Sequence, residues 1–198
     1  MKKKSTNKDF RYIVLTSIIT AILTAICSYF LQWEQRRHEY QYWKNKFIIE
    51  QSKQDLNDKI LICDKINNAF LKLNHAALVM KTESEFYKMS VDAHLSYDGA
   101  KTYDAIYNYF QELFVLISEL QKVSFYFPAD VINAVEKHSK TLSSFYEKNN
   151  ALVTQELQKD TYIDNKDLED YRREIILVIM NDIRNSSQQI VMALSESE

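Results

Sequence analysis

The sequence predicts an all-α protein, in which a single N-terminal transmembrane helix continues into a bundle of about five helices. The chain of 198 residues contains only one glycine, Gly99, and one proline, Pro128, whereas β-sheets need tight turns that depend on such residues. Residues 12–33 contain no charged side chain. Farther along, apolar residues recur at steps of three and four, which is the period of a helix with one buried face.

The charge-free segment is long enough to cross a bilayer. As a helix, residues 12–33 would span about 33 Å, compared with a hydrocarbon core of ~30 Å. Aromatic and basic side chains that favour the membrane–water interface flank it; they are Tyr12, Tyr29, Trp33, Arg36 and Arg37. We therefore predict a basic tail over residues 1–9 and a transmembrane helix over 10–33. A cleaved signal peptide is the alternative, but no small-residue cleavage site follows the apolar run.

The orientation of this helix rests on two opposing observations. Five basic residues precede the segment and four follow it, so the positive-inside rule favours a cytoplasmic N-terminus by a single residue. Cys27 and Cys63 have no motif neighbour and imply no disulfide framework, which favours a reducing compartment for the C-terminal domain.

One face of the predicted transmembrane helix carries small and hydroxylated residues. Ser17, Ala21, Thr24 and Ser28 recur at steps of four, three and four, and Thr20 lies beside them. Small residues let helices approach closely in lipid, and hydroxyl groups offer hydrogen bonds between helices. We expect an oligomeric seam that can also line a pore. The alternative is an ordinary single-pass anchor with incidental serine and threonine.

The helical pattern continues beyond the membrane segment without a flexible linker. Aromatic residues keep a spacing close to a heptad, with charges between them: Trp33, Tyr40, Trp43 and Phe47. A flexible tether would show Gly, Ser or Pro here. We therefore predict a juxtamembrane helix over residues 34–50. The polar residues 51–58 favour a bend or break before the bundle.

The remaining residues, 51–198, are predicted to form the helical bundle. Four apolar stripes indicate helices; they lie at 62–80, 103–120, 131–145 and 176–194. A capping-box sequence at Thr82 favours another short helix. The expected connections lie at Asp98-Gly99, at Phe127-Pro128 and before Asp164. The many tyrosines and phenylalanines are expected to form an aromatic core.

Missing motifs disfavour ordinary enzyme chemistry. One glycine cannot build a phosphate-binding loop or a nucleophile elbow, and no His and Cys residues have metal-ligand spacing. The net charge is −2, which gives no pattern for polyanion binding. We therefore expect no cofactor, no metal and no direct nucleic-acid binding. His138 is the exception of interest, because it lies on the apolar stripe of its helix, where a polar ring needs a partner.

A resemblance enters at the segment Asn133-Ala-Val-Glu-Lys-His138. It resembles a divergent HEPN motif, in which Arg, or a replacing Asn, precedes His by four to six residues. HEPN domains are small helical bundles, and many are dimeric ribonucleases whose paired motifs meet at an interface. A transmembrane helix followed by a HEPN-like bundle is similar to the small membrane-anchored accessory proteins of type VI-B CRISPR systems.

The resemblance implies a function and a location. It implies a homo-oligomeric membrane pore, or another membrane-perturbing assembly, that enhances antiviral defence by an RNA-guided RNA-cleaving CRISPR effector. The effector is cytoplasmic, so the expectation is a single-pass protein of the bacterial inner membrane with a cytoplasmic bundle.

The motif departs from that of active ribonucleases, so we expect no catalytic residue. Asn133 is neutral and cannot stabilise a phosphorane charge as arginine can. Five residues turn a helix by about 500°, which places Asn133 and His138 about 140° apart. A structural or interface role is therefore expected for the pair. The alternatives are a membrane-tethered HEPN-type ribonuclease and a non-catalytic scaffold that recruits a partner to the membrane.

Overall fold

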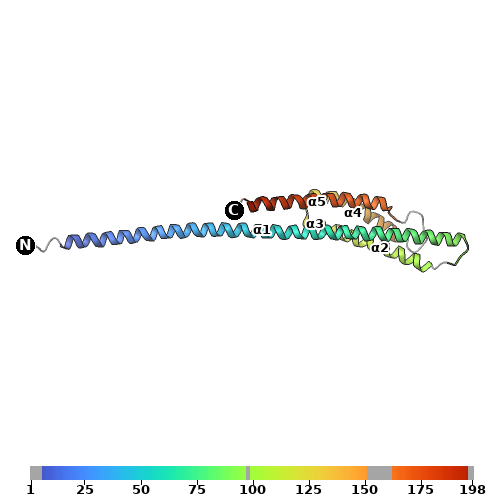
Figure 1. Ribbon diagram of the computed structural model, residues 1–198, viewed down its shortest axis with the longest axis horizontal. Coiled ribbons are helices and arrows are strands. Elements are labelled where there is room, and N and C mark those ends of the chain that lie inside the picture. Colours follow the sequence, from blue (N-terminus) through green and yellow to red (C-terminus); the bar gives the residue numbers. More distant parts are fainter. Residues whose placement is uncertain (1–5, 97–98, 151–161, 196–198) are drawn as a thin grey trace, which may run out of the picture. The chain divides into compact units, whose positions relative to one another are not determined.

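All regular structure in the described part of the chain is helical (Figure 1). The computed structural model describes residues 6–96, 99–150 and 162–195. The helices are α1 (Thr6–Asp92), α2 (Gly99–Gln121), α3 (Val123–Tyr126), α4 (Ala129–Asn150) and α5 (Asn165–Ser195). The predicted all-α class is confirmed. The chain divides into two units between Glu50 and Gln51, and each is described by itself.

The first unit consists of the beginning of α1. Helix α1 starts at Thr6, and residues 31–47 are helical throughout. The predicted continuation of the helix past Trp33 without a loop is therefore confirmed. Among the described residues, α1 is the one helix that is long and apolar enough to cross a membrane, judged by length and composition.

In the second unit, α1 runs to Asp92 without a break, and two expectations were wrong. Residues 51–58 are helical, and Leu56 packs against the core, so tertiary contacts stabilise this polar stretch as helix. Thr82 does not begin a helix. Its hydroxyl donates to the carbonyl of Leu78 at 2.9 Å, which is a bond made inside a helix, one turn back.

The end of α1 is a Schellman motif. The amide of Leu95 donates to the carbonyl of Ser90 at 2.8 Å, and the amide of His94 donates to that of Val91 at 3.2 Å. Between these bonds His94 takes a positive φ of 53°, the left-handed conformation that closes this motif and that glycine usually supplies. The chain thus turns toward α2 before Gly99, which is the first residue of α2.

The other two predicted helix boundaries are confirmed. Pro128 separates α3 from α4, and its carbonyl accepts the amide of Ile132 at 3.0 Å in the first turn of α4. The carboxylate of Asp164 accepts the amide of Lys166 at 2.8 Å at the start of α5, as a capping residue should. The helix of the stripe at 131–145 was expected to run on to about residue 157. Helix α4 reaches Asn150, and residues 151–157 lie outside the described residues.

The core of the second unit is built from the apolar stripes of four helices. The stripe at 62–80 is fully buried. In α2 the stripe is buried at Phe110, Leu113, Ile117 and Leu120, whereas Tyr103 at its beginning lies at the surface. Helix α4 packs against α2, α3 and α5. The prediction that the aromatic residues form a core is only partly right, because several aromatic side chains are more than half exposed, among them Tyr103, Tyr107, Phe114 and Phe125.

The buried face of α5 differs from the predicted one. In its first half the structure buries Ile175 and Ile179, whereas Met180, which belongs to the predicted stripe at 176–194, is 47% exposed. Farther along, Ile183 and Ile190 of the predicted stripe are buried. Six consecutive apolar residues at 175–180 satisfy the helical period on either of two faces, so the periodicity alone could not choose between them. As a result, Leu177 and Met180 remain on the outer surface of α5.

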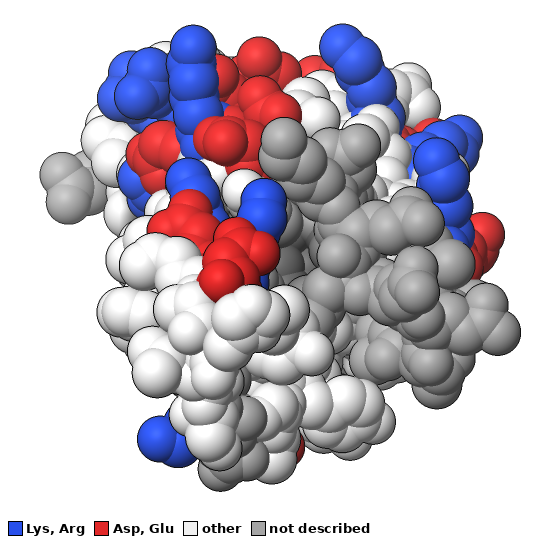
Figure 2. All heavy atoms as spheres, turned by 90° about the vertical axis from the view of Figure 1, so that its right-hand side faces the viewer, with Lys and Arg blue, Asp and Glu red and all other residues white. Residues whose placement is uncertain are grey.

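The surface at one end of the bundle carries charges of both signs. Figure 2 shows lysine and arginine side chains next to aspartate and glutamate side chains over the upper part of this face. Uncharged side chains cover much of its lower part. Interspersed charges of this kind produce no extended field for a polyanion.

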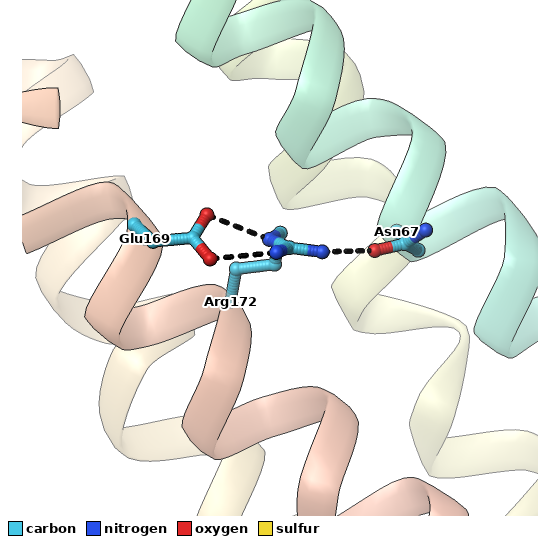
Figure 3. A network of polar contacts seen from close by, with 3 residues as sticks. All are labelled: Asn67, Glu169 and Arg172. Carbon is cyan, nitrogen blue, oxygen red and sulfur yellow. Dashed lines mark hydrogen bonds and ion pairs between the residues drawn. The ribbon is translucent and has the colours of Figure 1, made fainter. Parts of the chain in front are cut away.

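Polar contacts of Arg172 and of Lys59 tie α5 to α1. Arg172 forms a double hydrogen bond with the Glu169 carboxylate, at 2.8 and 2.6 Å, and also donates to the Asn67 side-chain oxygen at 2.8 Å (Figure 3). The hydrogen bonds from Arg172 lower the pKa of Glu169. The second contact joins the Lys59 ammonium to the Asp182 carboxylate at 2.6 Å.

A buried tyrosine fixes the beginning of the α5 segment. Tyr109 of α2 is fully buried, and its hydroxyl oxygen accepts the amide hydrogen of Ile163 at 3.0 Å. Burial raises the pKa of Tyr109 to about 12 from its ordinary value of 10.0, even though the hydrogen bond from Ile163 lowers it. The folded bundle therefore favours the neutral, protonated form of the Tyr109 hydroxyl.

Alkaline pH is expected to weaken the bundle through this tyrosine. Because the folded-state pKa lies above the unfolded one, the contribution is complete below pH 10 and is lost as the pH rises through about 12. Between these limits the parent should lose about 3 kcal/mol more unfolding free energy than Tyr109→Phe. Urea unfolding at a series of pH values measures this difference. Parallel losses in both proteins would show that Tyr109 ionises as readily when folded as when unfolded.

Candidate functional site

The apolar segment of α1 exposes its large side chains on all sides. Ile13, Ile19 and Leu23 are 65%, 49% and 57% exposed, and no residue from 12 to 33 is buried by the described part of the chain. Soluble monomers rarely expose so large a continuous apolar surface to water. Such a segment needs lipid or other protein around it.

The predicted seam residues lie together on this segment. A shallow groove runs along one side of the helix, and its lining contains all five predicted residues together with Thr16 and Ala25; these are Thr16, Ser17, Thr20, Ala21, Thr24, Ala25 and Ser28. The groove exists because these side chains are shorter than the isoleucines and leucines around them. A second helix could approach closely here.

Most hydroxyl groups of the groove already have an acceptor for their hydrogen. Thr20 donates to the carbonyl of Thr16 at 2.8 Å, and Thr24 donates to that of Thr20 at 2.8 Å. Ser17 donates to the carbonyl of Ile13 at 2.9 Å. These bonds let hydroxyl groups enter a lipid environment without an unsatisfied donor. They leave the hydroxyl oxygens as acceptors, so the groove combines close packing with a mildly polar, uncharged surface.

The predicted interface anchors flank the groove. Tyr12 and Tyr29 are 70% and 69% exposed, and Trp33 is 53% exposed. The Arg37 guanidinium carbon lies 5.8 Å from the centre of the Trp33 ring, a cation–π contact. Arg36 is also exposed. This combination of aromatic rings and cations is typical of a helix end at a membrane surface.

His138 lies in the contact between α4 and α5. It is 7% exposed, and its Nε2 atom is 2.8 Å from Oε2 of Glu174. The ring of Tyr171 lies 4.9 Å away, centre to centre. The prediction that His138 is largely buried at an interhelical contact and is hydrogen-bonded to a side chain is confirmed.

Asn133 does not share this site. It is exposed, near the beginning of α4, whereas His138 of the same helix is buried against α5. The structure therefore keeps the two motif residues on different sides of α4, as their five-residue spacing predicts. Glu174 and Tyr171, which do contact His138, were missed by the sequence reasoning. They belong to another helix, and no local pattern connects them with His138.

Among the described residues, no group of three or more His, Cys, Asp or Glu side chains is placed to hold a metal ion. Cys63 is buried, and burial raises the pKa of its thiol, which makes it a poor nucleophile. Two sites thus remain as candidates for function: the groove on α1 and the contact of His138 with α5.

His138→Ala is expected to lower the free energy of unfolding by about 1–3 kcal/mol. The substitution leaves a cavity beside Tyr171 and removes the contact with Glu174. Chemical unfolding of the full chain in detergent measures the loss, and Asn133→Ala, at an exposed position, is the control. If His138→Ala remains as stable as the parent but abolishes an RNA cleavage that the parent shows, the structural role is wrong and a catalytic one takes its place.

Comparisons with protein-family models, with curated proteins and with solved structures each found no match for this chain.

Proposed function

We propose that this chain is an oligomeric protein of the bacterial inner membrane that forms a pore or otherwise perturbs the membrane, and so enhances RNA-guided CRISPR antiviral defence. The observation that carries the proposal is the exposed, charge-free segment of α1 with a groove of small residues along one side. Large apolar residues elsewhere on the helix suit contact with lipid. The groove suits contact with another copy of the helix.

The hydrogen bonds of the groove are compatible with either a seam or a lumen. Hydroxyl hydrogens that donate to the helix backbone cost little in lipid, because no donor remains unpaired. Hydroxyl oxygens that still accept hydrogen bonds can interact with water or with a cation in a lumen. Ser17, Ala21, Thr24 and Ser28 are therefore proposed as the side chains at which neighbouring helices meet or which line the passage.

The link to defence rests on the resemblance described above. The order of a transmembrane helix and a HEPN-like bundle is similar to that of membrane accessory proteins of type VI-B CRISPR systems, whose partner is an RNA-guided RNA-cleaving effector. On this proposal the bundle is cytoplasmic and senses or transmits the activity of the effector without cleaving RNA itself. Asn133 and His138 then serve structure or assembly. The contact between His138 and Glu174 supports this role, because it gives the buried imidazole a polar partner between two helices of the bundle.

A membrane scaffold is the second candidate. The observation in its favour is the set of exposed aromatic side chains on α2 and α3, in particular Tyr103, Tyr107, Phe114 and Phe125, of which Phe125 is 81% exposed. Aromatic residues are enriched where proteins bind other proteins. Such a scaffold would hold a partner at the membrane without making it permeable.

Dye release from vesicles separates the two candidates. The purified full chain is incorporated into anionic phospholipid vesicles that contain a small fluorescent dye, and Ile22→Asp, which places a charge in the apolar segment, is the matched control. We expect the parent chain to release the dye and the variant to fail to insert. Vesicles that contain the inserted parent chain and keep their dye would contradict the pore and leave the scaffold as the remaining candidate.

A further inference from the structure

The bundle has a groove on the side of α4 that does not face α5. It is about 560 Å³ in volume and lies between α4 and the end of α2 with α3. Leu120, Val123 and Ile132 contribute apolar surface, and Ser139, Ser143 and Ser144 contribute hydroxyl groups. The groove is open at the surface, and its α4 side extends from Ile132 to Glu147, a length of about 22 Å along a helix. These dimensions suit another helix of about four turns.

Two carboxylates mark the α4 side of this groove. Glu136 and Glu147 are exposed and are separated by eleven residues, which is close to three helical turns, so they lie on the same side of α4. Glu136 is 2.9 Å from Lys140, which also lines the groove, in a contact that is largely open to solvent and therefore weak. Glu147 has no ion-pair partner among the described residues.

The outer face of α5 carries the complementary pattern. Arg173, Leu177, Met180 and Arg184 follow one another at steps of four, three and four, and all four are exposed. Leu177 and Met180 are 59% and 47% exposed. The two arginines have no ion-pair partner among the described residues, and they too are separated by eleven residues. Two cations thus flank two apolar side chains at the same spacing as the two carboxylates of the groove, about 16 Å.

The α5 helix of the same chain cannot occupy this groove. It already packs against α4 through His138 and Glu174, and His138 lies about 160° around α4 from Glu136. No described residue therefore covers the outer face of α5 or the groove on the same copy of the chain. Because they are different surfaces, they allow a head-to-tail contact that can repeat from one copy to the next.

We propose that the outer face of α5, with Arg173, Leu177, Met180 and Arg184, docks into the α2–α4 groove of a second copy of this chain. Leu177 and Met180 contact the apolar floor, and the two arginines pair with Glu136 and Glu147. A head-to-tail contact of this kind closes into a ring when the rotation between copies permits it. The inference deepens the proposed function, on whose oligomeric state it rests, by naming the surfaces through which the bundles assemble.

Disulfide cross-linking tests the contact and its direction. With α5 parallel to the α4 helix of the neighbour, Met180 lies opposite Ser143; with α5 antiparallel, Leu177 lies opposite Ser143. The full chain with Cys27→Ser is prepared with Ser143→Cys plus either Met180→Cys or Leu177→Cys, and is oxidised in detergent. One of the two pairs should give a ladder of covalent dimers, trimers and higher species. The variants with a single added cysteine should give no ladder.

Charge reversal supplies an independent test. Glu147→Arg should weaken self-association about tenfold, and a second reversal should restore it: Arg184→Glu for the parallel direction, or Arg173→Glu for the antiparallel one. Asp104→Arg, an exposed reversal outside the groove, should have no effect. Fluorescence energy transfer between labelled copies measures the association.

Two results would overturn the contact: an oligomer of unchanged mass that gives no ladder from either cysteine pair, or a Glu147→Arg variant that associates like the parent. Failure of the proposed function is a separate result. A cross-linked ladder from chains that never release dye would retain the contact and remove the pore, whereas dye release without a ladder would do the reverse.

Discussion

Lys59→Met is expected to lower the free energy of unfolding of the bundle by about 3 kcal/mol. The Lys59 ammonium is 2.6 Å from the Asp182 carboxylate and 3.2 Å from the Ser186 hydroxyl, and it lies 5.4 Å from the centre of the Phe127 ring. The side chains of Lys59 and Asp182 are only 15% and 16% exposed. Removing the lysine leaves a carboxylate that is mostly buried and has lost its counter-charge. Urea unfolding followed by circular dichroism measures the loss.

Two variants control for this ion pair. Replacing both members, with Lys59→Met and Asp182→Leu together, should recover most of the stability, because no buried charge remains. Lys140→Met removes the exposed pair with Glu136, whose side chains are 73% and 50% exposed, and should change stability by less than about 0.5 kcal/mol. Equal losses for Lys59→Met and Lys140→Met would show that burial does not strengthen the contact between α1 and α5.

The second large effect is expected in the groove of the apolar segment. Ala21→Leu or Ser28→Leu should weaken self-association about tenfold or more, because added bulk prevents close approach of two helices in lipid. Ile19→Leu, on the opposite side of the same helix, keeps the volume and is the matched control. Energy transfer between labelled copies, measured as the vesicles are diluted with lipid, reports the association.

The groove variants also separate two sources of assembly. If Ala21→Leu and Ser28→Leu leave the mass of the oligomer unchanged, the bundles alone hold the copies together, and the groove on α1 is no seam. If these variants and the charge reversal at Glu147 each weaken association, both units contribute. Because the sites lie in different units, their effects on the free energy of association should then add.

The parts of the fold that depend on local chemistry could be predicted from the sequence. The stripe at 62–80 is buried as its period predicts, because its steps of three and four place the stripe residues on a single face of the helix. Pro128 ends one helix and opens the next, since proline cannot continue a helix but suits its beginning. The scarcity of glycine and proline correctly predicted the all-α class, and the uninterrupted aromatic pattern correctly predicted a helix through residues 31–47.

The parts that depend on contacts between distant residues could not be predicted. Polar residues 51–58 stay helical because Leu56 and Lys59 contact the rest of the bundle. The buried face of α5 was ambiguous because 175–180 are all apolar, and only the packing of the bundle core chooses Ile175 and Ile179. Likewise, the burial of His138 followed from its own helix, but its partner Glu174 belongs to another helix whose facing side was unknown.

The mass of the detergent-solubilised full chain tests the central claim most directly. One chain has a mass of 23.5 kDa, so native mass spectrometry, which removes bound detergent in the gas phase, counts the copies in each particle. A membrane-embedded oligomer predicts one discrete multiple of 23.5 kDa that persists on dilution. Particles that contain a single chain at every concentration, from protein extracted out of the membrane fraction, would contradict the account.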